Sequence, residues 1–202
     1  MNEFTSRAIF VTLCVILCSG CALISPVNND TKKYVLNKIP IDLPVELTHS
    51  ATLLVLAPET DPTYATTQMA YTRQAYQIAY FSHNEWAETP SQMIQPLIVE
   101  TLQKTHYFSE IFASPYFGSH TYALRTEILE FNQDFSSNPA ILRLTMRFHL
   151  SREVAAQVIA TKELSVQQPL RDLTPYAGVV AANEAMASIL RELAKFTIEK
   201  AH

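Results

Sequence analysis

Hydrophobic and polar residues alternate along much of this chain in the pattern of a sheet protein. In the segment 142–150, leucine, methionine and phenylalanine residues occupy every second position. The positions between them hold Arg143, Thr145, Arg147 and His149. This alternation predicts an antiparallel strand with one buried and one exposed face. The continuous apolar run 53–56 instead predicts a strand buried on both faces.

Further extended segments are predicted around these two strands because they are rich in aromatic and β-branched residues. They are 34–36, 69–73, 77–81, 107–112, 122–131 and 154–166. The short gap between the second and third of these predicts a hairpin. In 122–131 the apolar face changes near Ile128 and Leu129, which indicates a β-bulge.

Helical spacing of apolar residues appears twice. Thr89 followed by Pro90 has the form of an N-cap and a first helical residue, and the pattern continues to about His106. Pro96 removes one backbone hydrogen bond from this helix, so we expect a kink or a start nearer Gln95.

A second, longer helix is predicted from Thr174–Pro175 to about Lys200. The middle of this helix is rich in alanine, which permits a close approach to the sheet or to a neighbouring subunit, and we interpret it as core packing. These elements together predict a single-domain α/β fold with a mixed β-sheet flanked by helices and a long C-terminal helix.

The first 20 residues do not follow these patterns and read as a secretory signal peptide. A short polar stretch with one cation, Arg7, precedes the apolar run 8–17, and small residues follow it. A helix needs roughly 20 apolar residues to cross a bilayer, so this run is too short for a permanent transmembrane helix.

The end of this segment, Cys18-Ser19-Gly20-Cys21, resembles the lipobox of bacterial lipoproteins, with Cys18 in the position usually held by leucine. The resemblance implies cleavage before Cys21 and fatty-acyl chains on that residue. The chemistry requires cysteine because its thiolate is a strong nucleophile. Two or three acyl chains hold a protein to a bilayer stably. The alternative is an ordinary signal peptide cut near Gly20.

Residues 21–33 form the predicted lipidated N-terminus and tether, because they are polar and lack periodicity. Ala22, rather than Asp, follows the acylated cysteine. By resemblance to the sorting of enterobacterial lipoproteins, this implies the periplasmic face of the outer membrane.

Composition excludes several classes of function. The chain is 48% hydrophobic and 17% charged, which is typical of a globular domain. The formal net charge is −4 and no run of Lys or Arg occurs, so nucleic acid is not an expected partner. All three cysteines lie at or before Cys21, so no disulfide can form within one processed chain.

A search for catalytic motifs finds neither a glycine-rich phosphate loop nor a G-x-S-x-G motif. The six histidines are scattered at no metal-ligand spacing. We therefore predict no catalytic site, no metal and no cofactor.

The segment 82–88 (Ser-His-Asn-Glu-Trp-Ala-Glu) is the best candidate for enzyme chemistry. Neighbouring side chains in a strand or turn point apart, so a catalytic triad is not implied. We interpret the segment as a polar turn before the first helix, with Trp86 anchoring it in the core. A partner surface is the alternative, because Trp, Tyr and Arg concentrate binding energy.

The order of these features resembles the PqiC-type family of ABC-type transport auxiliary lipoproteins. The resemblance combines the lipobox, the strand pair around Arg147 to Leu164 and a set of short motifs. These motifs are Tyr34-Val35-Leu36, Tyr71-Thr72-Arg73, Tyr80 through Trp86-Ala87-Glu88, the helix with Leu97 and Leu102, and Ala182-Asn183-Glu184-Ala185-Met186.

The resemblance implies a family domain at 34–200 that works beside an ABC transporter and Mce-domain proteins in envelope lipid transport. It also implies a homo-oligomer such as a ring. Our working hypothesis places a partner or subunit surface at Tyr71, Arg73, Tyr80 and Trp86. A lipoprotein regulator of peptidoglycan synthases is the alternative, and a hydrolase using His83 or Glu85 is a third possibility.

Overall fold

The computed structural model describes residues 30–153 and 157–201. The predicted signal peptide, Cys21 and the tether as far as residue 29 lie outside this part of the chain. Within it, residues Thr31 onward form one compact unit.

The described residues contain nine strands and two helices in one mixed α/β arrangement, as predicted. The strands are β1 (Lys32–Tyr34), β2 (His49–Val55), β3 (Glu59–Thr60), β4 (Gln68–Thr72), β5 (Ala79–Trp86), β6 (Phe108–Ala113), β7 (Tyr122–Asp134), β8 (Ile141–Arg152) and β9 (Gln157–Pro169). The helices are α2 (Pro90–Gln103) and α3 (Pro175–Lys200).

Strand β7 organises the sheet because it is long enough to pair with several partners. On one side it pairs antiparallel with β8, and β8 pairs antiparallel with β9. On its other side β7 pairs in succession with β2, β3 and β4, all parallel. Strand β6 extends the sheet beyond β2, whereas β5 and then β1 extend it beyond β4. The sheet therefore divides into two branches along the length of β7.

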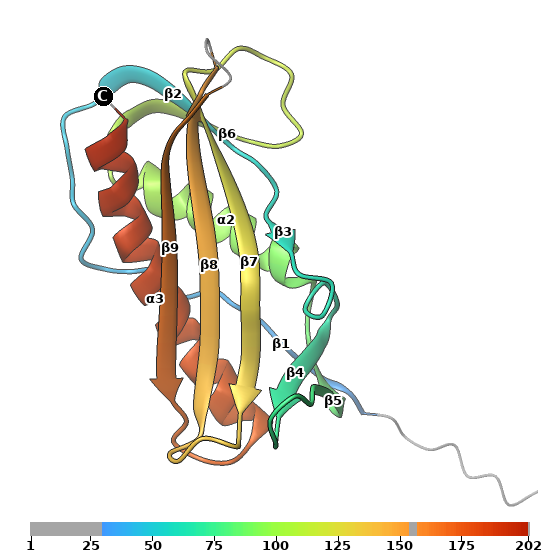
Figure 1. The fold of residues 1–202 in the computed structure, drawn as a ribbon. Helices are drawn as coiled ribbons and strands as arrows, with labels where there is room; N and C mark the ends of the chain where they lie inside the picture. Colours follow the sequence, from blue (N-terminus) through green and yellow to red (C-terminus); the bar gives the residue numbers. More distant parts are fainter. Residues whose placement is uncertain (1–29, 154–156, 202) are drawn as a thin grey trace, which may run out of the picture. The chain divides into compact units, whose positions relative to one another are not determined.

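Both helices cover the same face of the sheet and lie behind β7, β8 and β9 in Figure 1. The inward side chains of β8 form the centre of the core, and Leu144, Met146 and Phe148 have no exposed surface. Their polar neighbours Arg143, Thr145, Arg147 and His149 are half-buried on the other face. The alternation predicted for this strand is therefore confirmed.

Strand β2 is buried in the interior of the sheet, as the apolar run predicted. Leu53 and Val55 have no exposed surface and Leu54 is also buried. Strand β7 contains the predicted bulge, because its pairing with β8 shifts register between Ile128 and Glu130.

Several element boundaries differ from those predicted. Strand β1 begins at Lys32, inside the segment assigned to the tether, and ends at Tyr34 rather than Leu36. Strand β9 continues to Pro169 instead of ending at Val166. The predicted hairpin exists, since β4 pairs antiparallel with β5.

Helix α2 begins at Pro90, so a start near Gln95 is wrong. The backbone N–H and the hydroxyl of Thr89 both donate to Gln92 Oε1, at 3.2 and 2.7 Å, and these bonds fix the first turn. The helix includes Pro96 and ends at Gln103, three residues before the predicted end.

Helix α3 packs closely against the sheet, as its alanine content predicted. Ala182 and Ala185 have no exposed surface. Near its start, a Cβ atom placed on Gly178 would lie 2.0 Å from Cδ of the buried Gln133 on β7. Only glycine at residue 178 leaves room for the Gln133 side chain against the helix.

Candidate functional site

Tyr71 and Arg73 lie together at the end of β4. The Arg73 guanidinium lies over the Tyr71 ring, with Cζ 5.6 Å from the ring centroid. The Tyr71 ring also packs on Phe81 at 4.4 Å and on Phe135 at 6.0 Å between centroids. These two predicted surface residues therefore belong to one aromatic cluster.

An open cavity of about 350 Å³ adjoins this cluster, lined by Arg73, Phe81, Phe135 and Leu173. Three separate parts of the chain meet here: the β4–β5 hairpin, the β7–β8 turn and the loop before α3. Leu173 is 75% exposed, so the cavity has an apolar rim open to its surroundings.

Tyr80 does not join this cluster. It precedes Phe81 in β5, and successive side chains of a strand point to opposite faces. Its hydroxyl donates to the Thr63 carbonyl at 2.9 Å.

Burial, together with the charges of Glu130 and Asp61, raises the pKa of the neighbouring Tyr64 to about 12. Tyr64 is therefore neutral at ordinary pH.

Trp86 must be removed from the predicted partner surface, because only 4% of its area is exposed. Its indole stacks on Phe131, with centroids 5.1 Å apart and ring planes at 15°. The interpretation of Trp86 as a core anchor is confirmed.

Most of the segment 82–88 is strand and not a turn, contrary to our interpretation, and only Ala87 and Glu88 bend towards the helix. Residues Ser82 to Trp86 continue β5, which pairs with β4 on one side and with β1 on the other. Ser82 and His83 are both exposed, in the stretch of β5 where the register with β4 shifts, and Asn84 accepts a hydrogen bond from the Tyr34 hydroxyl at 3.1 Å. This geometry does not assemble a catalytic triad.

The open face of the sheet bears a network of ion pairs that sequence patterns did not reveal. Glu127 on β7 accepts from Arg147 at 3.1 Å and lies 3.4 Å from His149 Nε2. Arg147 also reaches Glu163 on β9 at 2.8 Å. The network joins three adjacent strands, although its members are partly exposed and each pair contributes little on its own.

The β7–β8 turn is held by a second polar group centred on Asp134. Its carboxylate accepts from the hydroxyls of Ser136 and Ser137 at 2.5 and 2.9 Å and from Arg143 Nε at 2.9 Å. Burial alone would raise the pKa of Asp134, but these hydrogen bonds outweigh it and hold the pKa well below its usual value. Asp134 is therefore charged at neutral pH and fixes the turn beside the aromatic cluster.

Among the residues that the structure describes, no group of three or more His, Cys, Asp or Glu side chains is placed to hold a metal ion. Within the same ranges, neither helix combines the length and apolar character needed to cross a bilayer.

These features define a small α/β domain with helices on one sheet face, a polar opposite face and an aromatic cluster at one end. A family model described as "ABC-type transport auxiliary lipoprotein component" matches residues 34–194. The chain belongs to this family, as the sequence resemblance indicated. The family is a transport component rather than a class of enzyme, and it implies a location in the cell envelope.

Solved structures share the fold at low sequence identity. A DUF330-family protein from Xanthomonas campestris is 15% identical with a TM-score of 0.77, covering 84% of this chain and 96% of its own. An uncharacterised protein is 15% identical with a TM-score of 0.67, covering 82% and 98%. A hypothetical protein from Chlamydia trachomatis is 10% identical with a TM-score of 0.50, covering 75% and 98%. The curated proteins contain no match to this chain.

Proposed function

We propose that this protein is a non-catalytic, periplasm-facing lipoprotein that tethers or bridges an ABC/Mce-type lipid-transport system to the outer membrane. The observation that carries the proposal is the family match over residues 34–194. The matched domain follows a cysteine, Cys21, that ends a lipobox-like sequence. Fatty-acyl chains, including palmitate, are attached to Cys21 and hold the domain at the membrane.

Contact with partner proteins takes place at the surface around Tyr71 and Arg73, and Tyr80 offers a second contact on the opposite face of the hairpin. Arginine and tyrosine favour such a role because they combine large contact area with directed polar groups. Arg73 is exposed, whereas Tyr71 is half-buried and held by Phe81. Binding there would cost little side-chain entropy for the tyrosine, because its ring is already ordered.

Self-association into a homo-oligomer, such as a ring, is the second part of the proposal. It is supported by β9, a 13-residue strand that pairs only with β8 among the described residues. A long strand edge with open hydrogen-bonding groups favours pairing with another chain.

The anchoring is tested by replacing Cys21 with Ala and separating membranes from soluble protein. The variant should leave the outer-membrane fraction for a soluble or inner-membrane form. Cys14→Ala is the matched control, since it also removes a thiol from the N-terminal segment but should leave fractionation unchanged. A Cys21→Ala protein that still fractionates with the outer membrane would contradict anchoring through this residue.

The partners are tested by purifying the acylated protein with its bound proteins. Mce-domain proteins, transporter subunits and lipid should accompany it, and Arg73→Glu should reduce their recovery. The charge-matched control is Arg125→Glu, because Arg125 lies on β7 and pairs with Glu59. This substitution should leave the recovery of partner proteins unchanged. Recovery of peptidoglycan synthases instead would favour the alternative regulator function.

A further inference from the structure

Four residues form an exposed, largely apolar surface at one end of the domain, which we name the tip surface: Arg73, Tyr76, Ile78 and Leu173. Tyr76 is wholly exposed, Leu173 is 75% exposed and Ile78 is 37% exposed. The first three lie in the turn between β4 and β5, and Leu173 precedes α3. The cavity shared by Arg73 and Leu173 brings the two segments together.

Tyr76 is unusual in both its exposure and its backbone. It has φ 66°, the left-handed region that residues other than glycine rarely adopt. A strained, solvent-facing aromatic residue at the end of a hairpin buries no surface within the chain itself. Such a residue is more often explained by a surface that it meets than by the fold.

The direction of β1 shows at which end of the domain the described chain begins. Strand β1 is parallel to β5, with Lys32 beside Asn84 and Tyr34 beside Trp86. Since β5 starts at the β4–β5 turn and runs away from it, β1 also runs away from the tip surface. The chain therefore enters β1 from the side of the tip surface.

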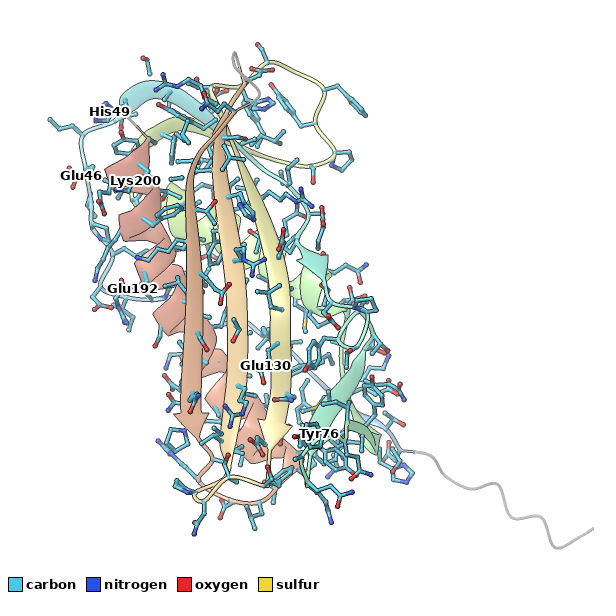
Figure 2. The ribbon with its side chains drawn as sticks, viewed as in Figure 1. Glu46, His49, Tyr76, Glu130, Glu192 and Lys200 are labelled. Carbon is cyan, nitrogen blue, oxygen red and sulfur yellow. The ribbon has the colours of Figure 1, made fainter. Side chains whose placement is uncertain are left out.

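The length of chain before β1 limits how far this end can be from an anchored Cys21. The roughly ten residues between Cys21 and Lys32 can span at most about 36 Å. The opposite end of the domain lies about 40 Å from the tip surface, the length of the 13 residues of β7, whereas Lys32 lies beside Asn84, five residues from the tip-side start of β5. Figure 2 shows Tyr76 near the last residues of β7 and His49 at the other end.

We propose that the tip surface inserts into the interfacial layer of the phospholipid bilayer to which Cys21 is anchored, an inference that rests on the acylation proposed above. The Tyr76 ring lies at headgroup depth, where amphipathic aromatic side chains concentrate. Ile78 and Leu173 meet the upper acyl chains. The Arg73 guanidinium stays over the Tyr71 ring at the rim of this surface, beside the partner contact proposed above. This contact fixes the orientation of the domain at the membrane, which a lipid tether alone does not.

The test uses the acylated full chain carrying Tyr76→Cys, whose free thiol is labelled with an environment-sensitive fluorophore. Its matched control is Phe117→Cys, because Phe117 is 98% exposed and lies in the loop before β7, at the other end of that strand. Both proteins are reconstituted into vesicles of phosphatidylethanolamine and phosphatidylglycerol, with or without lipids that carry a nitroxide quencher below the headgroup. Mass spectrometry first establishes the acyl chains on Cys21.

We expect the probe at residue 76 to shift to the blue and to lose fluorescence to the quencher, while the probe at residue 117 does neither. Leu173→Asp in the labelled Tyr76→Cys protein should reduce both effects. If acylated protein shows equal quenching at the two positions, the tip contact is wrong although the anchoring stands. A blue shift without quenching would assign the tip to a second copy of the chain and overturn the inference. An unmodified Cys21 would instead overturn the proposed function.

Discussion

The Trp86 indole stacks on the Phe131 ring and joins the end of β5 to the core side of β7, with 5.1 Å between ring centroids. Phe131 is also buried, at 4% exposure. Because β4 lies between these two strands, the stack holds together the branch of the sheet that carries the aromatic cluster.

Replacing Trp86 with Ala should lower the free energy of unfolding by about 3–5 kcal/mol, because it leaves a large cavity beside Phe131. Urea denaturation measures the loss. His83→Ala, an exposed position on the same strand, is the control and should change stability by no more than about 0.5 kcal/mol. Similar unfolding midpoints for the two variants would contradict the burial of Trp86.

Much of the fold could be predicted because its signals are local. The alternation in β8 reports one buried face directly, and the change of apolar face near Ile128 located a bulge that the register confirms. The two Thr-Pro pairs marked both helix starts, since Thr89 and Thr174 each make cap hydrogen bonds. These features depend on residues close together in the sequence.

The features that could not be predicted depend on distant pairing. Ser82, His83 and Asn84 have weak strand preference and read as a turn, but β5 continues through them because β4 pairs with Tyr80 and Glu85 on either side of them and β1 pairs with Asn84. The parallel pairing of β7 with β2, β3 and β4 carries no local signal either. The Asp134 turn did have a local signal, because an Asp with serines two and three residues later favours side-chain hydrogen bonds to nearby groups.

Thr174→Ala should lower the free energy of unfolding by about 1 kcal/mol, because the Thr174 hydroxyl accepts from the Ala177 N–H at 3.2 Å. Thr174→Ser keeps an equivalent acceptor and should retain most of this stability. Thermal unfolding of both variants makes the comparison. Equal losses for Ala and Ser would show that the hydroxyl does not cap α3.

Asp134→Asn should destabilise the fold by about 2–3 kcal/mol at neutral pH, because it weakens hydrogen bonds from Ser136, Ser137 and Arg143 to a buried charge. The pKa of Asp134 is lowered on folding, so its contribution is complete above the unfolded-state pKa of about 3.9. It is lost as the pH falls through the lower folded-state pKa.

Urea denaturation between neutral pH and strongly acidic pH tests this prediction. The difference between the parent protein and Asp134→Asn should stay constant down to about pH 4 and then shrink. Asp42→Asn is the control, since Asp42 pairs with Arg191 at an exposed site. A difference that grows on acidification would contradict the assigned direction of the pKa shift.

Gly178 and Gln133 should be coupled energetically, because a Cβ on residue 178 would overlap the Gln133 side chain. Gln133 is 2% exposed, and its Nε2 donates to the Pro175 carbonyl at 3.4 Å, so it cannot move away freely. Gly178→Ala should therefore lower the free energy of unfolding by about 1–3 kcal/mol.

When Gln133 is replaced by Ala the overlap disappears, and Gly178→Ala should then stabilise the helix by about 1 kcal/mol. Denaturation of both single variants and the double variant gives the coupling energy. Additive effects would show that α3 does not approach β7 as closely as the structure places it.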